Sequence, residues 1–202
     1  MGLQEASVDL RCTMATKTIE DQKLVAFYID QIKKTKEIVN RLSDMTEFSP
    51  TLLLNSLLSL VILPCEDAKK RDGKRIFPGT YKDLIKKVGV APVTFQPIER
   101  YANGEIVWEK KSVYAFVRKL RNGIAHQNLS VHVDVDRVVY ICIVNKFTNK
   151  TCIEEAKAQY QEKGLRATKS YIIDFEIRLT INQLKKVALY IADSYLKAIE
   201  GE

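Results

Sequence analysis

The chain has few of the residues on which metal sites and disulfide frameworks depend. Among its 202 residues are two histidines and four cysteines, and no two cysteines form a Cys-x-x-Cys pair. Two imidazoles are too few for a histidine-rich metal site. Scattered cysteines, together with an N-terminus that does not read as a secretory signal, indicate reduced thiols in a cytoplasmic protein. We therefore expect no metal and no cofactor.

Long apolar runs are also scarce. The run TLLLNSLLSLVIL at 51–63 has 13 residues before Pro64, which is too short for a helix that crosses a bilayer. It is apolar nearly all round, so we expect a central, buried helix that begins at Ser49-Pro50. Pro64 should kink or locally break this helix. The sequence predicts no membrane partner.

The overall composition is that of an ordinary globular chain with an excess of positive charge. The apolar fraction is 46% and the charged fraction 28%, and this length predicts one domain with a substantial core. The net charge is +7 and the pI about 9.1. This balance favours an anionic partner, nucleic acid first. The alternative is a basic surface without a specific partner.

The stretch KKSVYAFVRKLRNGIAHQNLS at 110–130 organises the chain. Its apolar residues recur at steps of three and four, which predicts an amphipathic helix: Val113, Phe116, Val117, Leu120 and Ile124. Ser112 suits the N-cap. Gly123 lies inside the pattern, where glycine costs about 1 kcal/mol relative to alanine. It indicates close approach by a neighbouring backbone or a ligand.

Three polar residues flank this apolar face: Arg121, Asn122 and His126. Asn122 and His126 are four apart and fall near one line of a helix, whereas Arg121 lies about 140° around and roughly 7.5 Å along the axis from His126. A straight helix therefore does not aim Arg121 and His126 at one atom. The helix could distort near Gly123, the long Arg121 side chain could wrap round, or a second copy could supply the missing group.

These side-chain types suit the cleavage of a phosphodiester. An imidazole exchanges protons near neutral pH, and a guanidinium holds a phosphate through paired hydrogen bonds. An amide such as that of Asn122 can orient a neighbour or the substrate. RNA supplies its own nucleophile, the 2′-OH, so the reaction needs no metal. A structural alternative is a histidine at a helix end beside a solvated arginine.

The string RNGIAH at 121–126 resembles the mark of the HEPN superfamily: Arg, a polar residue, a few further residues and His, late in a bundle helix. The run LLLNSLLSLVILPCE at 52–66 resembles the second helix of a plasmid- and defence-associated HEPN subgroup. The resemblance covers residues 18–130 and 180–198. It implies a helical bundle, a homodimer with a composite active site and metal-independent RNA cleavage. In the family, the histidine is the acid or base and the arginine binds the phosphate.

The fold that we expect is mainly α: a HEPN-like helical bundle with a small antiparallel β-sheet insertion in the C-terminal third. Residues 1–16 show no periodicity and predict a flexible arm, and 17–202 form a single domain whose β-rich insertion spans 130–179. Helices are predicted at 18–45, 51–63 and 81–90 and after Thr180, with a long loop, interrupted at most by one short helix, at 91–111. Strands are predicted at 131–135, 138–144 and 170–179. Residues 153–163 read either as a charged helix or as a mobile insertion.

Several other residues have two readings each. Glu66 could tune Arg121 or His126, but a capping or solvated acid after Pro64 is the preferred interpretation. The basic turn KKRDGKR at 69–75 could guide a phosphate backbone or simply be solvated. His132, Asp134 and Asp136 could bind a divalent ion, although a polar outer strand face is the preferred reading. Tyr101 and Trp108 could stack on bases, but burial is preferred.

The sequence thus predicts a metal-independent endoribonuclease that leaves 2′,3′-cyclic phosphate and 5′-hydroxyl ends, with Arg121, Asn122 and His126 as its site. The resemblance implies a toxin or phage-defence effector, restrained by an inhibitory antitoxin partner. Two alternatives stay open. One is a catalytically inactive HEPN module that binds nucleic acid or nucleotide, and the other is a protein-interaction module.

Overall fold

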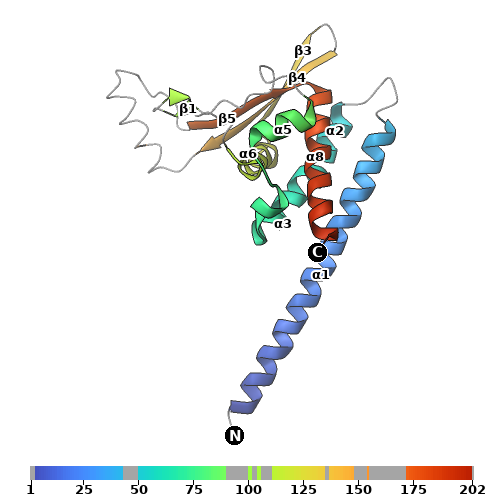
Figure 1. Cartoon of the computed structure of the whole chain (residues 1–202), viewed down its shortest axis with the longest axis vertical. Helices are drawn as coiled ribbons and strands as arrows, with labels where there is room; N and C mark the ends of the chain where they lie inside the picture. Colours follow the sequence, from blue (N-terminus) through green and yellow to red (C-terminus); the bar gives the residue numbers. More distant parts are fainter. Residues whose placement is uncertain are drawn as a thin grey trace.

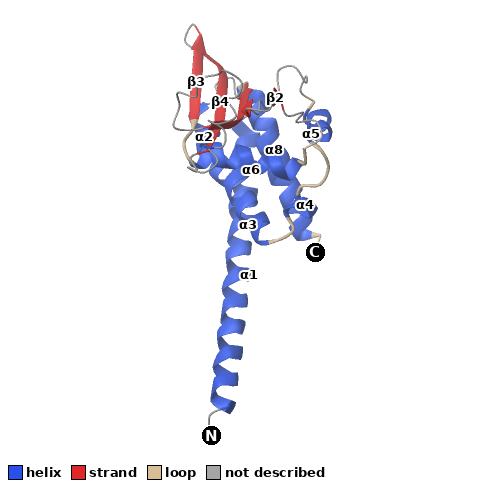
Figure 2. Ribbon diagram, turned by 90° about the vertical axis from the view of Figure 1, so that its left-hand side faces the viewer, coloured by secondary structure: helices blue, strands red, loops and turns tan. Residues whose placement is uncertain are grey.

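The computed structural model describes residues 3–42, 50–89, 100–101, 104–105, 111–134, 137–147, 154 and 172–201. These parts are mainly helical, with a three-stranded antiparallel sheet in the C-terminal third (Figure 1). The predicted fold class is confirmed. The sheet lies at one end of the molecule and the N-terminus of the first helix at the other (Figures 1 and 2).

Helix α1 (Leu3–Leu42) has 40 residues, which at 1.5 Å per residue makes it about 60 Å long. Its N-terminal half projects away from the rest of the chain (Figures 1 and 2), while Ile32 and Val39 in the other half are buried in the core. The predicted start near Thr18 is wrong, because the backbone is helical from Leu3. The flexibility expected of residues 1–16 stays a prediction.

The central helix continues through Pro64 instead of ending there. It consists of α2 (Pro50–Leu57), a π-helical segment η1 (Leu58–Ile62) and α3 (Leu63–Lys70). The N–H of Leu63 bonds to the carbonyl of Leu58, five residues back, so the local break predicted at Pro64 takes the form of a widened turn directly before it. The helix tolerates Pro64 because this residue lies in the first turn of α3.

The full helical stretch Thr51–Lys70 is long and apolar enough, by length and composition, to cross a membrane. This differs from the expectation drawn from the 13 residues before Pro64. Half of its most apolar part is buried in the structure, where it contacts α1, α6 and α8. We interpret it as the core helix of the bundle.

Two short helices follow. Asp72 caps α4 (Gly73–Ile76) by accepting hydrogen bonds from the N–H groups of Lys74 and Arg75, so the predicted basic turn at 69–75 contains a short helix. Thr80 forms a capping box with Asp83 at the start of α5 (Tyr81–Val88), which ends at Gly89 with φ +67°, as predicted.

The loop predicted at 91–111 lies largely outside the described residues, and so do Tyr101's side chain and Trp108. Its described part contains a small hairpin, β1 (Arg100–Tyr101) with β2 (Gly104–Glu105), where at most a short helix was expected. Residues 153–163 also lie outside the described residues, apart from Glu154.

The main sheet has the order β3 (Leu129–Asp134), β4 (Arg137–Phe147), β5 (Ile172–Leu179), with antiparallel neighbours. Its inner face is buried against α6 (Val113–Ala125) and α8 (Ile181–Glu200). The edge strand β3 reaches beyond the helices (Figure 2), and its Val131 and Val133 are 45% and 56% exposed. The alternation of valines at 131–135 predicts a half-buried strand with the valines on its buried face, and the exposure of Val131 and Val133 differs from this prediction. Val135 and Asp136 lie outside the described residues.

Helix α8 begins at the predicted cap, Thr180, which forms a capping box with Gln183. Its Tyr195 is fully buried and donates a hydrogen bond to the carboxylate of Asp67 on α3, at 3.0 Å. Arg71 Nε donates to the same carboxylate at 2.7 Å. This polar contact joins the last helix to the central one inside the core.

Candidate functional site

Helix α6 forms where the sequence predicts it and presents the three candidate residues at its C-terminal end. The Ser112 hydroxyl accepts a hydrogen bond from the N–H of Ala115 at 3.2 Å and caps the helix. The predicted apolar face is buried throughout. Arg121 and Asn122 consequently lie on the flank of the last two turns, where both are half-buried.

His126 is the C-cap of α6 rather than a residue within it. The helix ends in a Schellman motif, in which the N–H of Gln127 bonds to the Ile124 carbonyl and that of Asn128 to the Gly123 carbonyl. Gln127 takes the left-handed position with φ +53°, where glycine is usual. The exposed His126 therefore stands at the junction of α6 and β3, directly before a backbone conformation that L side chains rarely adopt.

Gly123 lies against the sheet. A Cβ atom at this position would come within 2.6 Å of Ile143 Cγ2 and 2.9 Å of the Val144 carbonyl oxygen on β4. The sequence predicted close approach by a backbone or a ligand, and the structure identifies a backbone. This contact holds the end of α6, with His126 just beyond it, against the central strand.

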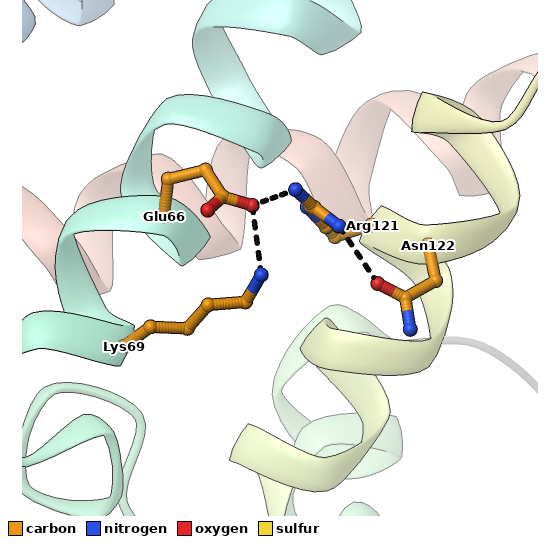
Figure 3. A network of polar contacts seen from close by, with 4 residues as sticks. All are labelled: Glu66, Lys69, Arg121 and Asn122. Atoms are coloured by element: carbon orange, nitrogen blue, oxygen red, sulfur yellow. Dashed lines mark hydrogen bonds and ion pairs between the residues drawn. The ribbon is translucent and has the colours of Figure 1, made fainter.

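Arg121 faces the central helix and forms part of a polar network (Figure 3). Its Nη2 makes an ion pair with Glu66 Oε1, and its Nη1 donates to Asn122 Oδ1 at 2.9 Å. Lys69 Nζ donates to the same Glu66 oxygen at 2.9 Å. The Arg121 side chain is 19% exposed, and its buried Nε has no hydrogen-bond partner among the described residues. Two cations thus share one carboxylate, with the amide of Asn122 holding one of them.

The sequence alone did not favour this pairing of Glu66. A capping or solvated acid after Pro64 was preferred, and the Glu66 side chain, which is 34% exposed in the first turn of α3, also pairs with Arg121. Lys69 was not singled out for this site at all. The available signal was the spacing of Glu66 and Lys69, three apart at the end of a buried helix, which places them on one face.

Cys65 adjoins this network but is not suited to nucleophilic chemistry. It is fully buried, and burial raises the pKa of its thiol from 9.0 to about 11, against the lowering effect of the nearby cations Lys69, Arg121 and Arg118. The thiolate is the nucleophilic form of cysteine. Cys65 is therefore not a candidate for a reactive group in this region.

The structure brings Arg121, Asn122, Glu66 and Lys69 together and leaves His126 apart from them. Among the described residues no hydrogen bond or ion pair joins the His126 side chain to Arg121. His126 follows Asn122 by four residues, so it continues the polar flank of α6 by about one turn. In the same parts of the chain, no group of three or more His, Cys, Asp or Glu residues is placed to hold a metal ion.

Comparison with known proteins identifies the family. No curated protein and no solved structure matches the chain. A family model described as HEPN pEK499 p136 matches residues 13–202, which include every described helix and strand except the first ten residues of α1. HEPN domains are helical, as this chain is, and are of the nucleotide-binding or ribonuclease type. The chain therefore belongs to the HEPN pEK499 p136 family.

Proposed function

We propose that the protein is a metal-independent endoribonuclease whose site is Arg121, Asn122 and His126. The observation that carries this proposal is the end of α6, where an exposed imidazole follows an anchored guanidinium by five residues. The family and the net charge of +7 support an RNA substrate.

The proposed reaction is an internal displacement at phosphorus. A basic imidazole of His126 takes the proton from the 2′-OH, and the resulting oxygen attacks the adjacent phosphorus. The bond from phosphorus to the 5′ oxygen breaks, and an imidazolium returns a proton to that oxygen. The products carry a 2′,3′-cyclic phosphate and a 5′-hydroxyl. Arg121 stabilises the charge on the non-bridging oxygens, and Asn122 orients the guanidinium.

We propose that a homodimer completes the site. The five-residue offset turns Arg121 and His126 about 140° apart on a straight helix. A two-fold pairing of α6 helices would place the Arg121 of one copy opposite the His126 of the other.

The first test is RNA cleavage in the presence of EDTA. The native protein should cleave a labelled RNA under chelation, and Arg121→Ala and His126→Ala should each lower turnover by about 10²-fold or more. Lys119→Ala is the matched control, since it removes another cation of α6 outside the site. Cleavage that depends on added metal, or that persists in both variants, would disprove the proposal.

A mixing experiment tests the composite site. Arg121→Ala and His126→Ala chains are each inactive, but a mixed dimer keeps one Arg121 and one His126 on different copies. Refolding the two variants together should restore cleavage. Mixing either variant with the double variant should not. Cleavage that never returns on mixing, in a protein shown to be dimeric by light scattering, would locate both groups in one chain.

A second candidate function is a HEPN module that binds RNA without cleaving it. The ion pair with Glu66 favours this reading, because it occupies the guanidinium that would meet the phosphate. Binding without cleavage would support it. We also propose a role as a toxin or phage-defence effector that an antitoxin partner holds inactive. This role rests on the family resemblance alone, and capture of a defined inhibitor that blocks cleavage would support it.

A further inference from the structure

A row of planar side chains crosses the outer face of the main sheet. His132 on β3 lies opposite Tyr140 on β4, and their rings stack with centroids 4.6 Å apart and planes inclined by 12°. Arg178 on β5 follows, with its guanidinium carbon 5.7 Å from the centroid of the Tyr140 ring. One planar group from each of the three strands thus forms a continuous row.

This row is not part of the core. The alternate residues Ile141 and Ile143 of β4 face the helices and are fully buried. His132 is exposed, Tyr140 is half-buried, and the Arg178 side chain is 61% exposed. The stack therefore presents planar groups to solvent on the side of the sheet that faces away from α6 and α8.

Glu176 fixes the orientation of Arg178. Its largely buried carboxylate accepts a hydrogen bond from Arg178 Nη2 at 3.1 Å. A guanidinium has five N–H donors, so this bond leaves donors that can bind a phosphate oxygen. The row thus offers both a stacking surface and an oriented phosphate donor.

We propose that His132, Tyr140 and Arg178 form a binding site for an unpaired base of RNA and its phosphate. The base continues the stack on the outward face of His132, and the guanidinium of Arg178 holds a neighbouring phosphate. Bases in a duplex are stacked inside and cannot reach such a surface, so the site selects single-stranded RNA. This inference rests on the proposed function, since it supplies the RNA contact that a nuclease of this kind needs.

The site is close to the proposed cleavage site along the chain. Strand β3 begins at Leu129, three residues after His126. An extended strand rises about 3.3 Å per residue, so His132 lies about 10 Å along β3 from Leu129. One short RNA strand could then contact His126 and the sheet together, and the sheet would position single-stranded segments for cleavage.

The test is binding of a fluorescent single-stranded RNA 12-mer, measured by anisotropy in EDTA with the full-length His126→Ala protein so that the RNA stays intact. His132→Ala should weaken binding by about 5-fold or more, the effect of one stacked base. His132→Phe should retain binding, because it keeps a planar face. Arg178→Ala should also weaken binding and reduce the slope of log K against log salt by about 0.7, the effect of one phosphate contact. A duplex of the same sequence should bind more weakly than the single strand.

Val131→Thr is the matched control, because Val131 is exposed on the same strand but on the alternate position. Val131→Thr should bind RNA as tightly as the parent His126→Ala protein. All variants should have the melting temperature of this parent. Binding by His132→Ala and Arg178→Ala within twofold of the parent overturns the inference. So does equal binding of duplex and single strand.

The proposed nuclease activity and the proposed RNA-binding site on the sheet can be disproved independently of each other. Cleavage by the native protein, with KM unchanged by His132→Ala and Arg178→Ala, supports the nuclease and overturns the sheet site. His132-dependent binding by a protein that never cleaves supports the sheet site and overturns the nuclease. A native protein that neither binds nor cleaves single-stranded RNA overturns both.

Discussion

At the scale of single residues, Glu66 determines how much positive charge the candidate site presents to an anion. Its carboxylate neutralises Arg121 and Lys69 at the same oxygen, and an RNA phosphate would compete for both. In the proposed nuclease, Glu66 is therefore a positioning residue: it holds the guanidinium in place and also opposes the binding of an anion.

Glu66→Gln separates these two effects. Loss of the negative charge should tighten binding of an uncleaved RNA by a few-fold, about the effect of one partly exposed ion pair. Loss of the ion pair should also let Arg121 move, and turnover should fall by about 10-fold or more. Measuring Kd in the His126→Ala background and kcat in the native background gives the two values. An unchanged Kd and kcat would show that the pair has no part in the chemistry.

The backbone conformation of Gln127, at the end of α6, lowers the stability of the folded protein. Its φ of +53° disfavours a residue with a Cβ, and glycine relieves this strain. Gln127→Gly should raise the free energy of unfolding by about 0.5–1 kcal/mol in urea denaturation, whereas Gln127→Ala, which keeps the Cβ, should leave it nearly unchanged. Equal values for the two variants would contradict the left-handed conformation beside His126.

Cys65 predicts a dependence of stability on alkaline pH. Its pKa is raised from 9.0 to about 11 in the folded protein, so the folded state keeps a proton that the unfolded state loses. This contribution is fully present below pH 9 and is lost as the pH rises from 9 to 11. It amounts to at most about 2–3 kcal/mol. The urea midpoint should fall less steeply over this range in Cys65→Ala than in the native protein. Parallel curves for the two proteins would refute this role.

At the scale of elements, the contact between α6 and β4 fixes where the helix ends. Gly123→Ala would improve helix propensity by about 1 kcal/mol in an open helix. Here its Cβ would meet Ile143 and the Val144 carbonyl, so we expect a net loss of about 1–3 kcal/mol in unfolding free energy. The double variant with Ile143→Ala should show a coupling that partly relieves this clash. A stabilised Gly123→Ala protein would mean that α6 and β4 are further apart.

The elements differ in how far the sequence could predict them. Helices begin at Ser112 and Thr180 and end at Gly89 because of local hydrogen bonds and φ angles. The residue types at these positions were therefore sufficient to predict where the helices begin and end. The exposure of Val131 and Val133 was not predictable, because alternation shows that one face differs from the other but not whether another element covers it. The pairing of Glu66 with Arg121 depends on how far α3 is rotated, and the π-helical segment that sets this rotation has no clear pattern in the sequence.

At the scale of the whole molecule, α1 packs against the other helices through its C-terminal half, while its N-terminal half projects away from them. Its inward residue Ile32 is fully buried, and its outward residue Phe27 is 54% exposed. Ile32→Ala should cost about 2–5 kcal/mol of unfolding free energy, whereas Phe27→Ser should change that of a monomer by no more than about 0.5 kcal/mol. Light scattering on Phe27→Ser then tests whether α1 belongs to the contact surface of the proposed homodimer: a loss of mass would show that it does, and an unchanged dimer would be consistent with the proposed pairing through α6.

The wide turn at Leu58–Ile62 also constrains how this protein can diverge. A π-helical turn holds one residue more than an α-helical turn, with hydrogen bonds that reach five residues back. Removing one residue from this turn would restore α-helical hydrogen bonds and leave Glu66 facing Arg121, whereas the same deletion in a regular helix would turn Glu66 by about 100° about the helix axis. Among natural variants that retain both partners, one-residue deletions between Pro50 and Glu66 should therefore be confined to the π-helical turn.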